Sequence, residues 1–381
     1  MDKPPRNRQS WAEIDLGALA FNIAQLKSRL RRPTRFMAVV KADAYGHGAV
    51  AVARAAAAEG VDWFGVATVP EAIELRAAGI EQPILLLSQP PVSALERLIE
   101  LDLTPAAADP EFIYQLAGAA QLQGKKVDYH LKVNTGMNRL GVRPEDVGAL
   151  MDELAGLPHV RMTGVFTQLA TAEVAGSPDA QAALRRFENA VAAIRAAGCD
   201  PGIVHAANSA GTILREEAHF DMVRCGIALY GLHPGEATRA YITLKPVMSV
   251  YSQAEQVHPI SAGEGVSYGL TWHADIGCAI VTLPIGYADG VPRNASGKLE
   301  FLHDGRRFEQ VGWVTMDQTM VRAMKNDPIK AGDTFVMIGE DGGASIPMDE
   351  VAQKAGTISY DIACGLGRRL ERVYLPAEGT R

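Results

Sequence analysis

The sequence predicts an α/β fold with an N-terminal (β/α)8 barrel and a smaller, mostly antiparallel β domain at the C-terminus. Up to about residue 235, short apolar runs alternate eight times with longer helical patterns. Eight parallel strands close such a barrel. After about Leu244, short β-branched runs bounded by Gly, Asp or Pro replace this pattern. A doubly wound open sheet is the alternative, but no GxGxxG motif follows the first strand.

The eight predicted barrel strands are short and apolar. They cover Phe36–Val40, Trp63–Val66, Ile84–Leu87, Leu103–Ala106, Tyr129–Val133, Gly164–Thr167, Ile203–Ala206 and Met222–Ala228. Between them lie stretches with apolar spacing near 3.6, for example Glu71–Ala78 and Ala180–Ala197. The second stretch is rich in Ala and ends before Gly198, which is typical of a helix end.

The sequence pattern of the C-terminal part differs from that of the barrel. Its predicted strands are Val247–Ser252, Ile276–Leu283, Lys298–Leu302 and Thr334–Ile338, and helical periodicity returns around Met348–Ala355. We therefore predict a TIM-type barrel over residues 12–244 and a β domain over residues 245–381. We expect the N-terminal segment 1–11 to join the β domain.

Composition excludes several classes of protein. With 48% hydrophobic and 21% charged residues, the chain is not mostly disordered or fibrous. A net charge of −7 argues against nucleic acid as a partner, although a local basic pocket can still hold a small anion. No secretory signal or stretch long enough to span a membrane is visible. Four cysteines without a CxxC pair predict no metal site and a cytoplasmic location.

Reactive side chains follow the predicted strands, where the active sites of (β/α)8 barrels lie. At these positions stand Lys41, Lys132, Arg139, Thr167, Gln168, His205, Ser209, Arg224, Gly226 and Ile227. The loops after strands seven and eight are the usual phosphate site of this fold. Ser209, at a predicted helix start, can offer a hydroxyl and backbone N–H groups to an anion.

Lys41 closes an apolar strand, and a partly desolvated lysine is suited to Schiff-base chemistry. Together with a phosphate site and the absence of Walker and Rossmann motifs, this lysine suggests pyridoxal phosphate as the cofactor. Structural alternatives stay open at this point. Lys41 can pair with Asp43, Arg224 with a neighbouring acid and Lys132 with an ordinary ion-pair partner. His205 is better interpreted as a core histidine, and Tyr268 by itself as a turn aromatic.

The motifs together resemble the alanine racemases, a pyridoxal-phosphate family that interconverts L- and D-alanine. The likeness runs nearly end to end. It covers Trp11–Leu16, Ala38–Gly48, Lys132–Gly141, His205–Ser209, Phe220–Gly231, Val266–Trp272, Ile285–Gly290, Val314–Gln318 and Thr357–Tyr360. The family's barrel and β domain agree with the architecture that the patterns predict.

The resemblance implies two bases on opposite faces of the substrate. Lys41 matches the lysine that holds the cofactor covalently and acts on D-alanine. Tyr268 matches the base for L-alanine, which the family supplies from the second subunit of a homodimer. Both side chains have pKa values of about 10 in water, so each must be shifted or coupled to work near neutrality.

The resemblance also implies binding roles. Arg224 matches the arginine that faces the pyridine nitrogen, and Lys132 matches a lysine that is often carbamylated and then holds Arg139. The positions that match phosphate contacts are Tyr45, Ser209, Gly226, Ile227 and Tyr360. Those near the substrate are Arg139 and Met316 at the carboxylate and Tyr287 at the entrance.

Two positions depart from the family pattern. Gln168 stands where the family has a histidine beside the cofactor ring, which implies an altered ring environment with the reaction type retained. Asn134 replaces an Asp that is frequent in the family.

We predict a cytoplasmic, homodimeric alanine racemase with a role in D-alanine biosynthesis. A broad-specificity or serine racemase on the same scaffold is the first alternative. A decarboxylase is expected to carry an acid in place of Arg224. A non-catalytic protein that holds the cofactor is expected to lack Tyr268.

Overall fold

The structure is a computed structural model that describes residues 8–30 and 33–376. The chain divides into two compact units. The barrel unit comprises Ala18–Ala44 and Ala49–Lys245. The β unit comprises the residues up to Gly17, Tyr45–Gly48 and the chain from Pro246 onward. The domain division at residues 244 and 245 stays a prediction, and its ends at residues 1–7 and 377–381 lie outside the described residues.

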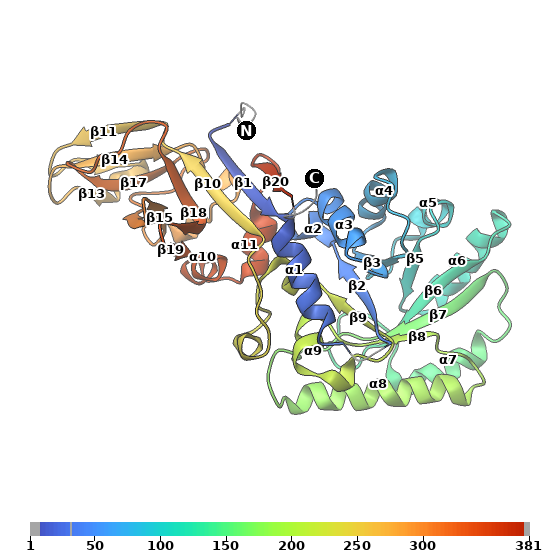
Figure 1. The fold of residues 1–381 in the computed structure, drawn as a ribbon. Coiled ribbons are helices and arrows are strands. Elements are labelled where there is room, and N and C mark those ends of the chain that lie inside the picture. The colour runs from blue at the N-terminus through green and yellow to red at the C-terminus, as the bar shows by residue number, and fades with distance from the viewer. Residues whose placement is uncertain (1–7, 31–32, 377–381) are drawn as a thin grey trace. The chain divides into compact units, whose positions relative to one another are not determined.

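The barrel unit contains one eight-stranded parallel sheet in the order β8-β7-β6-β5-β4-β3-β2-β9 (Figure 1). Its strands are β2 Arg35–Val39, β3 Trp63–Val66, β4 Ile84–Leu86, β5 Thr104–Ala107, β6 Val127–Lys132, β7 Val160–Phe166, β8 Ile203–His205 and β9 Met222–Cys225. Backbone hydrogen bonds from Asp221 N to Val204 O (3.0 Å) and from Arg224 N to Ala207 O (2.9 Å) join β8 to β9. The predicted (β/α)8 barrel is therefore confirmed.

The helices of the barrel unit lie outside its strands (Figure 1). They are α1 Leu16–Lys27, α3 Ala49–Ala58, α4 Val69–Ala77, α5 Leu95–Glu100, α6 Pro110–Leu122, α7 Val147–Glu153, α8 Pro178–Ala196 and α9 Ser209–Leu214. The segment labelled α2, Lys41–Tyr45, is a left-handed turn after β2. Local sequence explains their ends. The Ser177 side chain caps α8 by accepting from Ala180 N, and Gly198 follows its end with φ 75°.

Side chains from five strands fill part of the barrel core. They form one buried cluster of Met37, Leu85, Ala106, Phe166 and Met222. Parallel strands buried on both faces explain why these runs are continuously apolar in the sequence. This core holds the strand ends in place, and the polar side chains described below follow those ends.

The β unit is mostly antiparallel, as predicted. Its strands are β1 Ser10–Asp15, β10 Met248–Gln253, β11 Gln256–Ile260, β12 Gly265–Val266, β13 Trp272–His273, β14 Cys278–Leu283, β15 Glu300–His303, β16 Arg306–Glu309, β17 Thr319–Met324, β18 Thr334–Asp341, β19 Ala344–Ile346 and β20 Glu371–Leu375. One sheet has the order β16-β15-β18-β10-β1-β20, and a second has the order β11-β14-β17. Sequence patterns did not predict β1, β11, β12, β13, β16, β17, β19 or β20.

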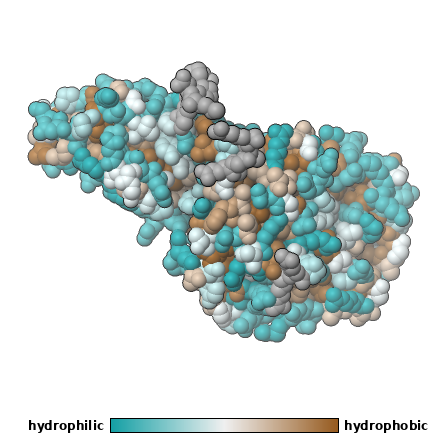
Figure 2. Space-filling view, viewed as in Figure 1, coloured by the Kyte–Doolittle hydropathy of each residue, from teal (hydrophilic) through white to brown (hydrophobic). Residues whose placement is uncertain are grey.

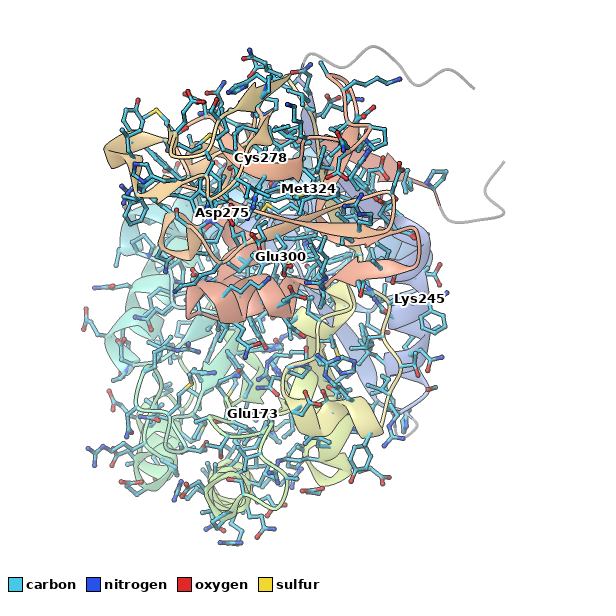
Figure 3. The ribbon with its side chains drawn as sticks, turned by 90° about the vertical axis from the view of Figure 1, so that its left-hand side faces the viewer. Glu173, Lys245, Asp275, Cys278, Glu300 and Met324 are labelled. Carbon is cyan, nitrogen blue, oxygen red and sulfur yellow. The ribbon has the colours of Figure 1, made fainter. Side chains whose placement is uncertain are left out.

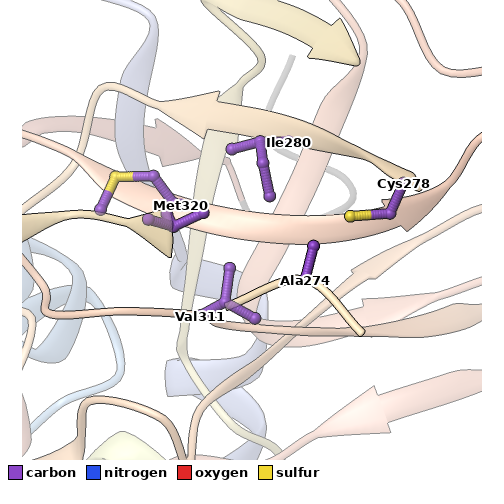
Figure 4. Close-up of a cluster of buried hydrophobic side chains, with 6 residues drawn as sticks. Ala274, Cys278, Ile280, Val311 and Met320 are labelled. Carbon is purple, nitrogen blue, oxygen red and sulfur yellow. The ribbon is translucent and has the colours of Figure 1, made fainter. Parts of the chain in front are cut away.

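Apolar packing and ion pairs stabilise the β unit. A buried cluster includes Cys278, Ile280, Val311 and Met320 (Figure 4). The helices are α10 Met348–Ala355 and α11 Ser359–Gly365. Lys354 of α10 donates to Glu300 at 2.7 Å, and Glu300 lies beside this helix in Figure 3.

On the face drawn in Figure 2, polar and apolar residues are intermixed. Within residues 8–30 and 33–376, no helix has the length and apolar character needed to span a membrane.

Candidate active site

Most of the predicted site residues belong to the barrel unit and follow the carboxyl ends of its strands. Lys41 comes two residues after β2, Lys132 ends β6, Gln168 comes two residues after β7, and Arg224 lies in β9. The positive charges of Arg224, Arg139 and Lys41 all lower the pKa of Lys132, so the fold brings these four basic side chains together. This end of a (β/α)8 barrel is where catalysis occurs.

Lys41 begins a left-handed turn. Residues 42–45 are all non-glycine residues with φ of 53–54°, a conformation that costs about 1–2 kcal/mol per residue. The side chain of Glu71 stabilises this turn by accepting from Ala42 N at 2.7 Å. Its other oxygen accepts from Ala67 N and Thr68 N at the start of α4. One carboxylate thus joins the lysine turn to a helix start.

We expect Glu71→Ala to loosen the turn that carries Lys41. The variant leaves three backbone N–H groups without their acceptor, and we expect a loss of about 1–3 kcal/mol in the free energy of unfolding. Urea unfolding measures this loss. Arg97→Ala is the control, because Arg97 is an exposed partner of Glu100 and its loss is expected to cost under about 0.5 kcal/mol. Equal stability of the two variants would contradict the role of Glu71.

Arg224 is buried and donates several hydrogen bonds. Its Nη2 donates to Thr167 O (2.7 Å), Ala206 O (3.1 Å) and Gln168 Oε1 (3.2 Å). Burial lowers the pKa of Arg224 to about 10, so the guanidinium stays protonated at neutral pH. Gln168, the residue that departs from the family pattern, is therefore a partner of Arg224.

A chain of two histidines continues from Arg224. Arg224 Nη1 lies 3.1 Å from His205 Nδ1, and His205 Nε2 lies 2.9 Å from His130 Nδ1. Because arginine only donates, His205 Nδ1 must accept from Arg224, which places the proton of His205 on Nε2. His205 Nε2 then donates to His130 Nδ1, which places the proton of His130 on its own Nε2. Burial, followed by the charge of Arg224, lowers the pKa of His130 to about 3 and that of His205 well below its usual value. Both rings are therefore neutral, and each orients the next.

His130 was not singled out from the sequence, and His205 was interpreted as a core histidine. His205 is fully buried, but it also contacts Arg224. A signal for His130 is its position two residues before Lys132, because side chains at i and i+2 of a strand share one face.

Lys132 is buried, and its Nζ lies 4.1 Å from the centroid of the Phe166 ring. Burial, followed by the three neighbouring cations, lowers the pKa of its amine well below the usual value. Lys132, Arg139 and Gln168 line one small pocket of about 10 Å³, close to the volume that holds a single water. The structure thus brings these three predicted residues together.

Ser209 begins α9 and meets the loop after β9. Its Oγ accepts from Gly226 N at 2.9 Å and from Ala228 N at 3.4 Å. Ile227 begins the 3-10 helix η4 Ile227–Tyr230. Three predicted phosphate contacts, Ser209, Gly226 and Ile227, therefore lie together, and hydroxyl and N–H groups of this kind suit a phosphate.

The other predicted residues belong to the β unit. Tyr45 and Tyr360 lie with ring centroids 6.1 Å apart. Burial, then Tyr360 and Cys364, raises the pKa of Tyr45, so its hydroxyl stays a donor. These two predicted phosphate contacts are therefore neighbours.

Tyr287 and Met316 are also neighbours. Tyr287 N donates to Thr315 O, and Ala288 N donates to Met316 O, both at 3.0 Å. Tyr268 lies in a different loop, in the 3-10 helix η6 Tyr268–Leu270 between β12 and β13, and is 76% exposed. Ser267 fixes this loop by donating to Trp313 O at 2.7 Å. In the described part of the chain, no group of three or more His, Cys, Asp or Glu side chains is placed to hold a metal ion.

Known proteins match the chain over nearly its whole length. The family models for the N-terminal and C-terminal domains of alanine racemase match residues 14–234 and 247–374. The alanine racemase of Symbiobacterium thermophilum is 46% identical over 96% of this chain and 97% of its own. That of Desulfovibrio desulfuricans is 42% identical over 97% and 99%.

Solved structures agree. The alanine racemase of Clostridium difficile 630 matches with a TM-score of 0.93 and 35% identity, covering 97% of each chain. That of Bartonella henselae, which has covalently bound pyridoxal phosphate, matches with a TM-score of 0.86 and 31% identity, covering 97% of this chain and 100% of its own. The resemblance predicted from the motifs is confirmed: the chain belongs to the alanine racemase family.

Proposed function

We propose that the protein interconverts L-alanine and D-alanine with pyridoxal phosphate held covalently by Lys41. The observation that carries this proposal is the grouping of Lys41, Lys132, Arg139 and Arg224 after the barrel strands of a chain that aligns end to end with alanine racemases. The relatives favour this activity over the alternatives of a broad-specificity or serine racemase, a decarboxylase and a non-catalytic protein.

The residues present fit the cofactor. Ser209, Gly226 and Ile227 bring together hydroxyl and N–H groups that suit its phosphate. The family resemblance implies that the hydroxyls of Tyr45 and Tyr360, which are neighbours within the β unit, are further phosphate contacts. Arg224 has five N–H donors and stays protonated, so it can donate to the ring nitrogen. When bound, the cofactor supplies an electron-withdrawing ring that acidifies the Cα proton of the amino acid.

The chain's own residues move that proton. Lys41 Nζ exchanges it on the face used by D-alanine, and Tyr268 Oη exchanges it on the face used by L-alanine. Arg139 and Met316 orient the substrate carboxylate, and Tyr287 restricts the size of the side chain that enters. Arg224 does not give up its own proton at neutral pH, which limits electron withdrawal at the ring and disfavours side reactions such as transamination.

Incubation with L-alanine in deuterated buffer tests the activity. We expect D-alanine that carries deuterium at Cα. L-alanine that stays unexchanged with cofactor-loaded protein would overturn the proposal.

We also propose that the enzyme is a cytoplasmic homodimer that supplies D-alanine for biosynthesis. Within the described residues, four cysteines form no disulfide, which supports a reducing compartment: Cys199, Cys225, Cys278 and Cys364. The exposed Tyr268 supports a dimer in which this residue acts in the partner's site.

We propose that Lys132 is carbamylated. Its lowered pKa favours the neutral amine that attacks CO2, forming an N–C bond and releasing a proton. The carbamate is negatively charged and lies among the positive charges of Arg139, Arg224 and Lys41. An unmodified lysine is neutral or positive and cannot supply this negative charge.

We expect Lys132→Ala to lower kcat about tenfold to a hundredfold, because Arg139 loses the anion that orients it. Native mass spectrometry is expected to show one added CO2 in the wild type and none in the variant. An unmodified Lys132 in bicarbonate buffer would contradict the carbamate.

A further inference from the structure

The proposed cofactor site has two ends, and they follow neighbouring strands of the barrel. Lys41 comes two residues after β2, and the predicted phosphate contacts Gly226 and Ile227 follow β9 directly. β2 pairs with β9 in parallel, and the last pair in the register is Ala38 with Cys225. Beyond this pair the chain after β9 turns into η4. The pairing of the two strands therefore stops short of both ends of the site.

Tyr230 joins the two chains beyond the strand pairing. It is the last residue of η4, its side chain is fully buried, and its hydroxyl donates to Val39 O at 2.9 Å. Val39 is the last residue of β2 and lies two positions before Lys41. On the other side of β2, Val40 N donates to Gly65 O of β3 at 2.9 Å. Because successive residues of a strand direct their backbone groups to opposite sides, Val39 O faces the side of β9.

Two further hydrogen bonds hold η4 in place. Ser209 Oγ accepts from Gly226 N at 2.9 Å, immediately before this 3-10 helix. Asn22, which is fully buried in α1, donates from Nδ2 to Leu229 O at 3.0 Å near the end of the helix. The segment that carries the predicted phosphate contacts is therefore fixed at both of its ends. The hydrogen bond from Tyr230 then fixes the end of β2 relative to this segment.

Pyridoxal phosphate needs the two ends of the site at a matching separation. Its aldehyde and its phosphomethyl group are attached to neighbouring carbons of one ring, so the molecule itself nearly fixes their separation. Both groups bind at full strength only where Lys41 Nζ and the phosphate contacts have the same separation. In this chain, Val39, Tyr230 and the rest of η4 connect the two ends. A hydrogen bond of 2.9 Å between buried groups leaves little freedom in this connection.

We propose that Tyr230 is a positioning residue that sets the separation between Lys41 and the phosphate contacts through its hydrogen bond to Val39 O. It acts through the backbone of β2 and is not itself a catalytic residue. This role rests on the proposed function, in which Lys41 holds pyridoxal phosphate covalently. Ligands that reach both ends of the site at once therefore depend on Tyr230, and ligands that reach only one end do not.

Tyr230→Phe tests the role, because it removes the hydroxyl and keeps the buried ring. Equilibrium dialysis of the full chain, freed of cofactor, measures the dissociation constant of pyridoxal phosphate. Competition against pyridoxal phosphate gives the dissociation constants of pyridoxal, which lacks the phosphate, and of inorganic phosphate. We expect pyridoxal phosphate to bind about tenfold more weakly to the variant, as for other small displacements of binding groups. Pyridoxal and inorganic phosphate are expected to keep their wild-type affinities.

Two results for Tyr230→Phe would overturn the positioning role. If all three ligands bind more weakly by the same factor, Tyr230 supports only the general fold of the site. If pyridoxal phosphate binds as tightly as to the wild type, the hydroxyl does not set the separation. Both results leave the proposed function intact. A wild-type chain that does not bind pyridoxal phosphate would instead contradict the proposed function, and the role of Tyr230 with it.

Tyr114→Phe is the matched control in the same unit. The Tyr114 ring is exposed on α6, and its hydroxyl donates to Glu153 Oε1 at the end of α7, at 3.0 Å, so we expect wild-type affinities for all three ligands. Thermal unfolding gives a second measurement, because each ligand raises the midpoint according to its affinity. Pyridoxal phosphate is expected to raise the midpoint less in Tyr230→Phe than in the wild type, and pyridoxal to raise it equally in both. An equal rise with pyridoxal phosphate in both chains would overturn the proposal.

Discussion

A mixed dimer of one Lys41→Ala chain and one Tyr268→Phe chain is expected to have about half of the wild-type racemase activity, although each variant alone is inactive. The dimer contains one intact site if Tyr268 acts in the partner's site. That site combines Lys41 of the Tyr268→Phe chain with Tyr268 of the Lys41→Ala chain. The other site lacks both bases.

The exposure of Tyr268 supports a site that is shared between two chains. A catalytic base with 76% of its side chain exposed needs a second surface to exclude water from it. The loop that carries Tyr268 is nevertheless held in place, because Ser267 Oγ donates to Trp313 O at 2.7 Å. An exposed side chain on a fixed loop suits a residue that a neighbouring chain receives.

Two chains with different affinity tags allow the mixed dimer to be purified. Its matched control pairs a wild-type chain with a chain that carries both substitutions. If Tyr268 acts in the partner's site, the control has no intact site and is inactive. If Tyr268 acts within its own chain, the two results are reversed. The pair of dimers therefore distinguishes the two arrangements.

The single variant Tyr268→Phe is expected to affect the two directions of proton exchange differently. We expect racemisation to fall about a hundredfold to ten-thousandfold, the usual contribution of a general base. Deuterium exchange at Cα of L-alanine is expected to fall with it, and exchange at Cα of D-alanine is expected to persist through Lys41. Equal loss of both exchanges would contradict separate bases.

Local patterns predicted the barrel well because its parallel strands are buried and its helices are amphipathic. β3 was predicted with its observed bounds, Trp63–Val66, and so was α10, Met348–Ala355. β1 and β20 were missed because they are defined by distant partners. β1 pairs with β10 and β20, more than 230 residues away in the sequence for β10 and more than 350 for β20.

The sequence indicated candidate site residues but not the geometry of the site. Strand ends indicated Lys41 and Arg224, but the sequence of residues 42–45 does not predict a run of left-handed residues, because Ala and Tyr ordinarily avoid positive φ. The contact between His205 and His130 depends on two strands that are 75 residues apart in the sequence. Such a contact follows from tertiary packing and not from any local pattern.

Gly164→Ala is expected to displace the His130 ring and so to disrupt its hydrogen bond with His205. A Cβ at Gly164 would lie 2.6 Å from His130 Cε1 and Nε2, closer than atoms approach in proteins. The His130 ring cannot easily move, because it is fully buried and bonded to His205 at 2.9 Å. We therefore expect a loss of about 1–3 kcal/mol in the free energy of unfolding, the usual cost of overpacking.

The effect on catalysis follows from the same contact. When the His130 ring is displaced, His205 loses its acceptor and no longer holds Arg224 Nη1 in a fixed orientation. We expect kcat to fall about tenfold to a hundredfold, as for other small displacements of positioning groups, with a smaller change in KM. Steady-state kinetics on the cofactor-loaded variant measures both constants.

Two further variants isolate the clash. Gly118→Ala is the matched control, because Gly118 lies within α6 with nothing within 4 Å of its added Cβ, and we expect a gain of about 0.4–1 kcal/mol in the free energy of unfolding. In the double variant Gly164→Ala with His130→Ala, the ring is removed, so the added methyl group no longer has a clash. We expect the double variant to be more stable than the sum of the single losses by about 1–3 kcal/mol. Additive losses would show that the methyl group at residue 164 does not act through His130, and the proposed chain from β7 to Arg224 would be wrong.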